Sequence, residues 1–215
     1  MPPADLAAVV FDLDGTLLDS VGIQVESYRL AIVEMGGRDH SHEEILGSFA
    51  LGPASNMLAT LIGRPVGDEA VSRYQAHLQM RAAEVAPYEG IAEALAGLAG
   101  RFRLGVFTAA DTAAAELLLD AAGIQGSFDA VVGADRIARS KPAPDGLLLA
   151  CEMLGVDPGE AAYVGDGPSD MATARACGAL GVAAGWGHQY AAAREADLTA
   201  ASPSDLVRLL MPDLA

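Results

Sequence analysis

The sequence predicts an α/β protein with a Rossmann-like parallel sheet, helices on both faces of the sheet, and a small helical cap inserted after the first strand. Short apolar runs of strand length alternate with helical patterns, which is typical of a parallel sheet covered on both faces. The interval 20–87 instead contains only helical patterns, separated by Gly and Pro. We therefore expect a core of residues 1–19 and 88–215 and a cap of residues 20–87.

Five apolar runs are short enough to be buried strands. In chain order they are Leu6–Phe11, Phe102–Phe107, Ala130–Gly133, Ala161–Val164 and Leu180–Ala184. Polar residues stand at the ends of three of them: Asp12 after the first, Thr108 after the second and Asp166 just beyond the fourth. Because open parallel sheets bind ligands beyond the carboxyl ends of their strands, we expect these three side chains to share one site.

The composition argues against several classes of partner. The chain has 215 residues with 29 Asp and Glu against 13 Lys and Arg, a net charge of −16, so neither nucleic acid nor a membrane surface is an expected partner. No apolar stretch reaches the roughly 18 residues of a membrane span, and no secretory signal pattern opens the chain. We expect a cytoplasmic protein, either a monomer or a homodimer.

The cysteines and histidines offer no pattern of metal ligands. Cys151 and Cys177 fit neither a metal-ligand spacing nor a disulfide framework, and we expect both to be small core residues. Three histidines lie in polar stretches of the cap region and are expected to be exposed: His40, His42 and His77. His188 follows Gly187 in a predicted loop and is placed where it could face the crevice beyond the sheet.

The segment from Phe11 to Ser20 carries two carboxylates, Asp12 and Asp14, directly after an apolar strand. A turn or a helix N-cap would also favour Asp and Gly. However, Asp12 emerges from a buried run, where an unpaired carboxylate is costly unless a metal or a cation compensates its charge. The pattern Asp-x-Asp-Gly-Thr is rare by chance, so the functional interpretation is favoured over the structural one.

Two later segments add charged residues. Lys141 is the only lysine of the chain, since every other strongly basic residue is Arg, and this suggests a role for a compact ammonium group. Asp166 and Asp170 lie four residues apart at a predicted turn from strand to helix. Taken alone, this pair has an alternative interpretation as an N-cap and a first-turn acid that stabilises the helix dipole.

Taken together, these segments resemble the four motifs of the haloacid dehalogenase-like hydrolase superfamily. The motifs occur in the expected order: Asp12-Leu13-Asp14-Gly15-Thr16, then Thr108, then Lys141, then Gly165-Asp166-Gly167-Pro168-Ser169-Asp170. The insertion between the first two motifs resembles the group with a small helical cap that includes phosphoglycolate phosphatases. Ala109 and Ala110 stand where those phosphatases often carry Asn or Ser, which leaves the substrate open.

The resemblance implies a Mg²⁺-dependent phosphatase that hydrolyses a small phosphorylated metabolite, a phosphate monoester, through an aspartyl-phosphate. It assigns nucleophilic attack to Asp12 and proton transfer to Asp14. It assigns phosphate binding to Thr108, the neighbouring backbone at Ala109, and Lys141.

The same resemblance implies a Mg²⁺ site of oxygen ligands. The ligands would be the carboxylates of Asp12 and Asp166 and the backbone carbonyl of Asp14. Asp170 would hold a metal-bound water or Lys141. In the cap, we expect the loop Gly47–Pro53 to face the crevice and Ser48 and Phe49 to contact the substrate, although an ordinary interhelical loop is the alternative interpretation.

Other functions of this superfamily fit these residues less well. Asp14 argues against a dehalogenase, and a phosphonate hydrolase would need a cap lysine, which residues 20–87 lack. A phosphosugar mutase of the β-phosphoglucomutase type remains an alternative, although Thr16 stands where such mutases tend to have an aliphatic residue. A non-catalytic binding protein of the same fold is the second alternative.

Overall fold

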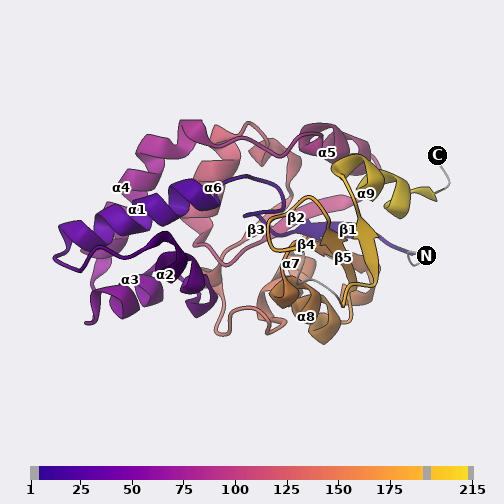
Figure 1. Ribbon diagram of the computed structural model, residues 1–215. Coiled ribbons are helices and arrows are strands. Elements are labelled where there is room, and N and C mark those ends of the chain that lie inside the picture. The colour runs from indigo at the N-terminus through magenta and orange to yellow at the C-terminus, as the bar shows by residue number, and fades with distance from the viewer. Residues whose placement is uncertain (1–4, 191–194, 213–215) are drawn as a thin grey trace.

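The computed structural model describes residues 5–190 and 195–212, and these contain one six-stranded parallel sheet in the order β3-β2-β1-β4-β5-β6 (Figure 1). The strands are β1 (Ala8–Phe11), β2 (Arg103–Phe107), β3 (Ala130–Val132), β4 (Ala161–Gly165), β5 (Leu180–Ala184) and β6 (Leu198–Ala200). The five predicted strands are confirmed, with ends that differ by at most two residues. The edge strand β6 was missed because its three residues, with an exposed threonine at the centre, form no apolar run.

Helices cover both faces of the sheet, as predicted. On one face Val9 and Phe11 of β1 belong to an apolar cluster with α5 (Ile91–Ala99), α6 (Thr112–Ala121) and α9 (Pro203–Leu210). On the other face Ala8 and Val10 pack in a cluster with α7 (Asp145–Leu154) and α8 (Pro168–Cys177). Because both faces of β1 are buried, the strand is apolar at every position.

A helical insertion separates β1 from β2. It contains α1 (Val21–Glu34), α2 (His42–Gly47), η1 (Phe49–Leu51), α3 (Ala54–Ile62), α4 (Asp68–Arg81) and η2 (Ala82–Glu84). In Figure 1 its helices α1 to α4 lie together, on the side of the molecule away from both termini. The rings of Tyr28 in α1 and Tyr74 in α4 stack with centroids 3.9 Å apart, so an aromatic contact joins the two longest helices of the insertion.

The two linkers that join the insertion to the sheet lie side by side. The backbone N–H of Tyr88 donates to Leu17 O at 3.0 Å, and that of Asp19 donates to Ala86 O at 3.2 Å. Leu18 and Pro87 form an isolated antiparallel bridge between them. The chain therefore enters and leaves the insertion at one place, directly beyond the carboxyl end of β1.

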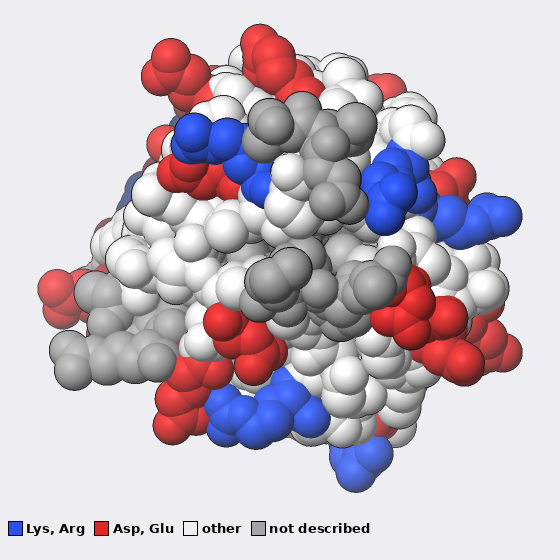
Figure 2. All heavy atoms as spheres, turned by 90° about the vertical axis from the view of Figure 1, so that its right-hand side faces the viewer, with Lys and Arg blue, Asp and Glu red and all other residues white. Residues whose placement is uncertain are grey.

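Three short 3₁₀ turns complete the core: η3 (Gln125–Ser127), η4 (Ala134–Arg136) and η5 (Pro158–Glu160). Among the described residues, none of the helices is both long enough and apolar enough to cross a membrane. Figure 2 looks onto the end of the molecule with the two termini, where basic side chains lie in small groups among acidic and uncharged ones. No continuous basic patch is visible on that face.

Two histidines of the insertion are less exposed than expected. His40 is buried, and its Nε2 lies 2.8 Å from Leu61 O in α3. His77 is partly buried beside Glu34, whereas His42 is exposed as expected.

Candidate active site

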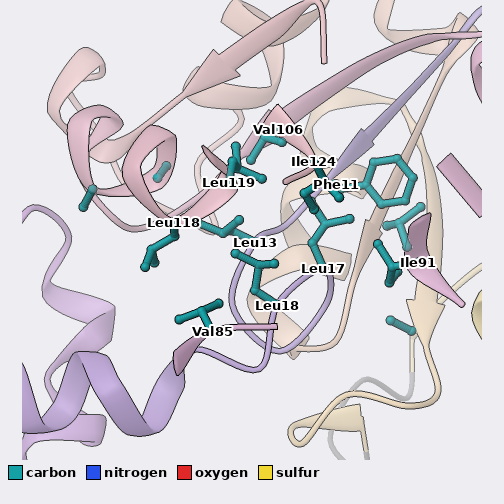
Figure 3. Close-up of a cluster of buried hydrophobic side chains, with 14 of the residues drawn as sticks. Phe11, Leu13, Leu17, Leu18, Val85, Ile91, Val106, Leu118, Leu119 and Ile124 are labelled. Atoms are coloured by element: carbon teal, nitrogen blue, oxygen red, sulfur yellow. The ribbon is translucent and has the colours of Figure 1, made fainter. Parts of the chain in front are cut away.

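The loop after β1 turns two carboxylates away from the core and three leucines into it. Leu13, Leu17 and Leu18 are fully buried in the apolar cluster drawn in Figure 3. Gly15 has a φ of 83°, in the left-handed region that favours glycine, and its N–H donates to Leu18 O at 2.9 Å. The buried leucines thus anchor a tight loop.

Lys141 links two of the predicted acids. Its Nζ lies 2.6 Å from Asp12 Oδ1 and 2.8 Å from Asp170 Oδ1, and all three side chains are nearly inaccessible to solvent. The ammonium also lies 5.1 Å and 5.3 Å from the ring centroids of Phe107 and Tyr163. A buried cation therefore compensates the carboxylate that emerges from β1, as the sequence argument required.

The charge state of this cluster follows from its burial and its partners. Burial on its own would lower the pKa of Lys141. The negative charges of Asp12 and Asp170 have the larger combined effect and raise this pKa well above its ordinary value. Lys141 is therefore a permanent cation. Burial raises the pKa of Asp12, and the ammonium of Lys141 opposes that rise. The charged form of Asp12 thus depends on its cationic neighbour.

Asp14 has a different environment from Asp12. Its Oδ1 accepts hydrogen bonds from Ser20 Oγ and from Gln24 Nε2, which lies in the first helix of the insertion. Burial raises the pKa of Asp14, while these two hydrogen bonds partly oppose the rise. A carboxyl group with a raised pKa is suited to donating a proton. Sequence reasoning missed the contact with Gln24, because a helix pattern does not reveal what its first turn faces beyond the helix.

Asp166 is held by the loop that follows β5. Its Oδ2 accepts from the backbone N–H of Gln189 at 2.9 Å and lies 3.5 Å from Nδ1 of His188, so His188 does lie beside the site. The same loop contacts the first motif, because Trp186 Nε1 donates to Thr16 O at 2.8 Å. The sequence offered no signal for the contact between Gln189 and Asp166.

The acidic side chains fit a hard divalent cation. Asp12, Asp166 and Asp170 each offer a carboxylate oxygen, and these oxygens lie within 4.8 Å of one another. Within the described ranges, this is the one group of three or more His, Cys, Asp or Glu residues with such spacing. A buried set of carboxylate oxygens without sulfur or imidazole suits Mg²⁺. The Asp14 carboxylate is outside this group, since Ser20 and Gln24 hold it elsewhere.

A pocket of about 540 Å³ lies over these groups, within the range of small-molecule sites. We call its two sides the core wall and the insertion wall. The core wall consists of Asp12, Asp14, Thr108, Ala109, Ser140, Lys141, Asp166, Gly167, Ser169, Asp170 and Gln189. The insertion wall consists of Glu43, Leu46, Gly47 and Phe49.

The structure brings all but one of the predicted site residues to this pocket. Thr108 is buried at the end of β2, where its Oγ1 accepts from Ala110 N at 3.1 Å. Ser48 is the exception, because it follows the last turn of α2 and its hydroxyl donates to Ile45 O at 2.6 Å. Its side chain is buried there and does not line the pocket, contrary to the expectation of a substrate contact. Sequence reasoning did not include Glu43 or Leu46.

Comparison with known proteins places this site in a family. The profile described as "Haloacid dehalogenase-like hydrolase" matches residues 9–184, which include all four motifs. The "Probable phosphatase IndB" of Dickeya dadantii (strain 3937) is 35% identical over 187 residues, covering 83% of this chain and 81% of that protein. A phosphoglycolate phosphatase of Chromobacterium violaceum is 32% identical over 228 residues, covering 95% and 96%.

The fold is also found among solved structures. The crystal structure of CbbY from Rhodobacter sphaeroides, in complex with phosphate, matches with a TM-score of 0.81 over 94% of this chain and 96% of that chain. The identity of 22% means that this likeness shows the fold alone. Since the profile spans most of the chain and the two relatives cover 83% and 95% of it, the chain belongs to the haloacid dehalogenase-like hydrolases and is a phosphatase.

Proposed function

We propose that the protein hydrolyses small phosphate monoesters with the help of Mg²⁺ and through an aspartyl-phosphate formed on Asp12. The observation that carries this proposal is the buried Lys141 between Asp12 and Asp170, at the base of a pocket. A fixed cation beside a buried carboxylate allows an anionic nucleophile to approach an anionic phosphate. A structural ion pair alone would not need such a pocket.

In the first step Asp12 attacks the phosphorus atom. The bond from phosphorus to the ester oxygen breaks, and Asp14 transfers its proton to the departing alkoxide. Ser20 and Gln24 orient the Asp14 carboxyl group for that transfer. The products of this step are the free alcohol and the phosphoryl group bound to Asp12.

The phosphate oxygens are held by groups of the core wall. Lys141 supplies a positive charge, and the Thr108 hydroxyl and the backbone N–H of Ala109 would donate hydrogen bonds. Asp12, Asp166 and the Asp14 carbonyl would hold Mg²⁺, and Asp170 supports Lys141. When bound, Mg²⁺ would neutralise charge on the phosphate oxygens.

In the second step Asp14 acts as a base. It accepts a proton from a water molecule, whose oxygen attacks the phosphorus atom of the phosphorylated Asp12. The acyl phosphate bond breaks, which releases inorganic phosphate, regenerates the Asp12 carboxylate and leaves Asp14 protonated for the next cycle. One residue therefore serves as acid and as base within one turnover.

We assign the role of a cap to residues 20–87, with residues 1–19 and 88–215 as the catalytic core. Glu43, Leu46, Gly47 and Phe49 of the insertion face the acids of the core across the pocket. A wall in that position limits the entry of water to the aspartyl-phosphate and contacts the alcohol part of the substrate.

The proposal is tested by measuring inorganic phosphate released from an aryl phosphate. Chelation of divalent ions is expected to abolish release and added Mg²⁺ to restore it, whereas Ca²⁺ is expected to inhibit, because its looser coordination misplaces the phosphate. After an acid quench, a phosphoryl group should be found on the peptide that contains Asp12. Full activity after exhaustive chelation would overturn the role of the metal ion. Isomerisation of a sugar phosphate without phosphate release would favour the mutase instead.

A further inference from the structure

The pocket is strongly acidic beyond what the reaction itself uses. Its lining contains five carboxylates, Asp12, Asp14, Glu43, Asp166 and Asp170, and a single ammonium, that of Lys141. The four acids of the core wall all accept hydrogen bonds from named partners. Glu43 differs from them, because no hydrogen bond or ion pair joins its side chain to another described residue. Its charge is free to act on what enters the pocket.

The alcohol part of a substrate would lie next to Glu43, because its phosphate would be bound at the core wall. Glu43 belongs to the first turn of α2, on the insertion wall with Leu46, Gly47 and Phe49. The ring of Phe49 is supported from behind by Tyr28, at a centroid distance of 6.0 Å. Neither Lys nor Arg of the insertion is among the described residues that line the pocket. The insertion wall thus offers one negative charge and an aromatic ring.

In an ester with two anionic groups, the pocket would stabilise the phosphate but repel the second group. The phosphate would lie against Lys141, the single cation among the described residues of the lining. A second carboxylate or phosphate on the alcohol would then face Glu43 without a compensating cation, which costs free energy. An ammonium group in the same place would be attracted both by Glu43 and by the face of an aromatic ring such as that of Phe49.

We infer that Glu43 selects substrates by charge, an inference that rests on the phosphatase function proposed above. The favoured substrates are phosphate monoesters of amino alcohols, followed by esters of uncharged alcohols. Esters whose alcohol carries a second anionic group are disfavoured, and phosphoglycolate belongs to this third class. The preferred substrate of this chain would therefore differ from phosphoglycolate, the substrate in the name of its relative from Chromobacterium violaceum.

Three esters of nearly equal size test this inference, because they differ mainly in charge: phosphoethanolamine, 2-hydroxyethyl phosphate and phosphoglycolate. We expect kcat/KM of the wild-type protein to fall in that order. The first and last should differ by about tenfold, since attraction of the ammonium and repulsion of the carboxylate by an exposed charge each contribute about threefold. The difference should shrink as ionic strength rises, because Glu43 is exposed.

Two variants of Glu43 and one control assign the effect to this residue. Glu43→Gln should bring the ratio between phosphoethanolamine and phosphoglycolate close to one, because both contributions come from the charge of Glu43, and Glu43→Lys should reverse the order. Glu69→Gln is the control, because Glu69 is also a first-turn acid of an insertion helix but lies outside the pocket lining. It should keep the wild-type ratio, and circular dichroism should show all three variants folded.

The results separate this inference from the proposed function. If aryl phosphate is hydrolysed but wild type prefers phosphoglycolate, or Glu43→Gln keeps the wild-type ratio, the charge selection is wrong and the phosphatase function stands. If no ester, including aryl phosphate, releases inorganic phosphate with Mg²⁺ present, the proposed function fails and the inference fails with it.

Discussion

The core wall of the pocket holds its charged groups in place, whereas the insertion wall leaves its single charged group exposed. Asp12, Asp166 and Asp170 are at most 8% exposed, and each accepts a hydrogen bond from a named donor. Glu43, facing them, is exposed and has no such donor among the described residues. Fixed groups suit a reaction that needs its atoms in one geometry, whereas an exposed side chain can be substituted with little effect on the structure around it. We therefore expect changes in the two walls to have different signatures.

The largest effect is expected at Asp12 in the core wall. Asp12→Asn should lower kcat by at least about 10³, because an amide is a poor nucleophile and cannot balance Lys141. All esters should lose activity in parallel, since the nucleophile is common to every substrate. The measurement is steady-state release of inorganic phosphate from an aryl and an alkyl ester. Near-normal turnover by a folded variant would remove Asp12 from its assigned role.

A second change in the core wall should depend on the leaving group. Asp14→Asn is expected to lower kcat for an alkyl phosphate by about 10² to 10⁴, because an alkoxide needs a proton. An aryl phosphate, whose leaving group hardly needs one, should lose less. The ratio of the two losses is the quantity to measure. Equal losses on both esters would show that Asp14 is not the proton donor.

The third change separates charge from shape in the core wall. Lys141→Arg keeps a positive charge, but the planar guanidinium does not fit between Asp12 and Asp170 as the compact ammonium does. We expect a loss of at least about tenfold in kcat/KM, or roughly 1.4 kcal/mol of transition-state stabilisation. Wild-type turnover by the variant would mean that Lys141 serves only as a counter-ion.

The smallest effect is expected in the insertion wall, where the order of substrates should change instead of the overall rate. Phe49→Ala removes an apolar surface of the pocket and should raise KM for esters of bulky apolar alcohols about threefold or more. Ser48→Ala is a neighbouring control, because its hydroxyl bonds Ile45 O outside the pocket and should affect stability only. Assays over a panel of esters would decide this. A parallel loss on all esters in Phe49→Ala would make that ring structural.

The two walls also differed in how far the sequence predicted them. The core wall residues Asp12, Thr108, Lys141 and Asp166 follow strands or lie in ordered motifs, so strand ends and motif order sufficed to bring them together. In the insertion wall, Gly47 and Phe49 were predicted from their loop between helices, whereas the positions of Glu43 and Leu46 depend on how helices pack against the core, which local patterns do not encode. Glu43 was therefore not predicted.

Two further failures have the same kind of cause. Ser48 was expected in the pocket because it lies in the loop Gly47–Pro53. Instead, its hydroxyl donates to the carbonyl of Ile45 in the last turn of α2. The contact of Gln24 with Asp14 was not predicted. It forms because the first turn of α1 packs against the loop that carries Asp14, where Gln24 and Ser20 donate to the same carboxylate oxygen. Such contacts depend on tertiary placement, which the periodicity of a single helix does not contain.

The insertion begins and ends at the paired linkers beside Leu18 and Pro87. Its two ends lie next to each other, so another helical unit could be grafted between them without changing the register of β1 with β2 and β4. The nucleophile and Lys141 would remain with the sheet, whereas the whole insertion wall would be exchanged at once. The alcohol-facing side of the pocket could thus change by replacement of one contiguous segment, residues 20–87, instead of by scattered substitutions.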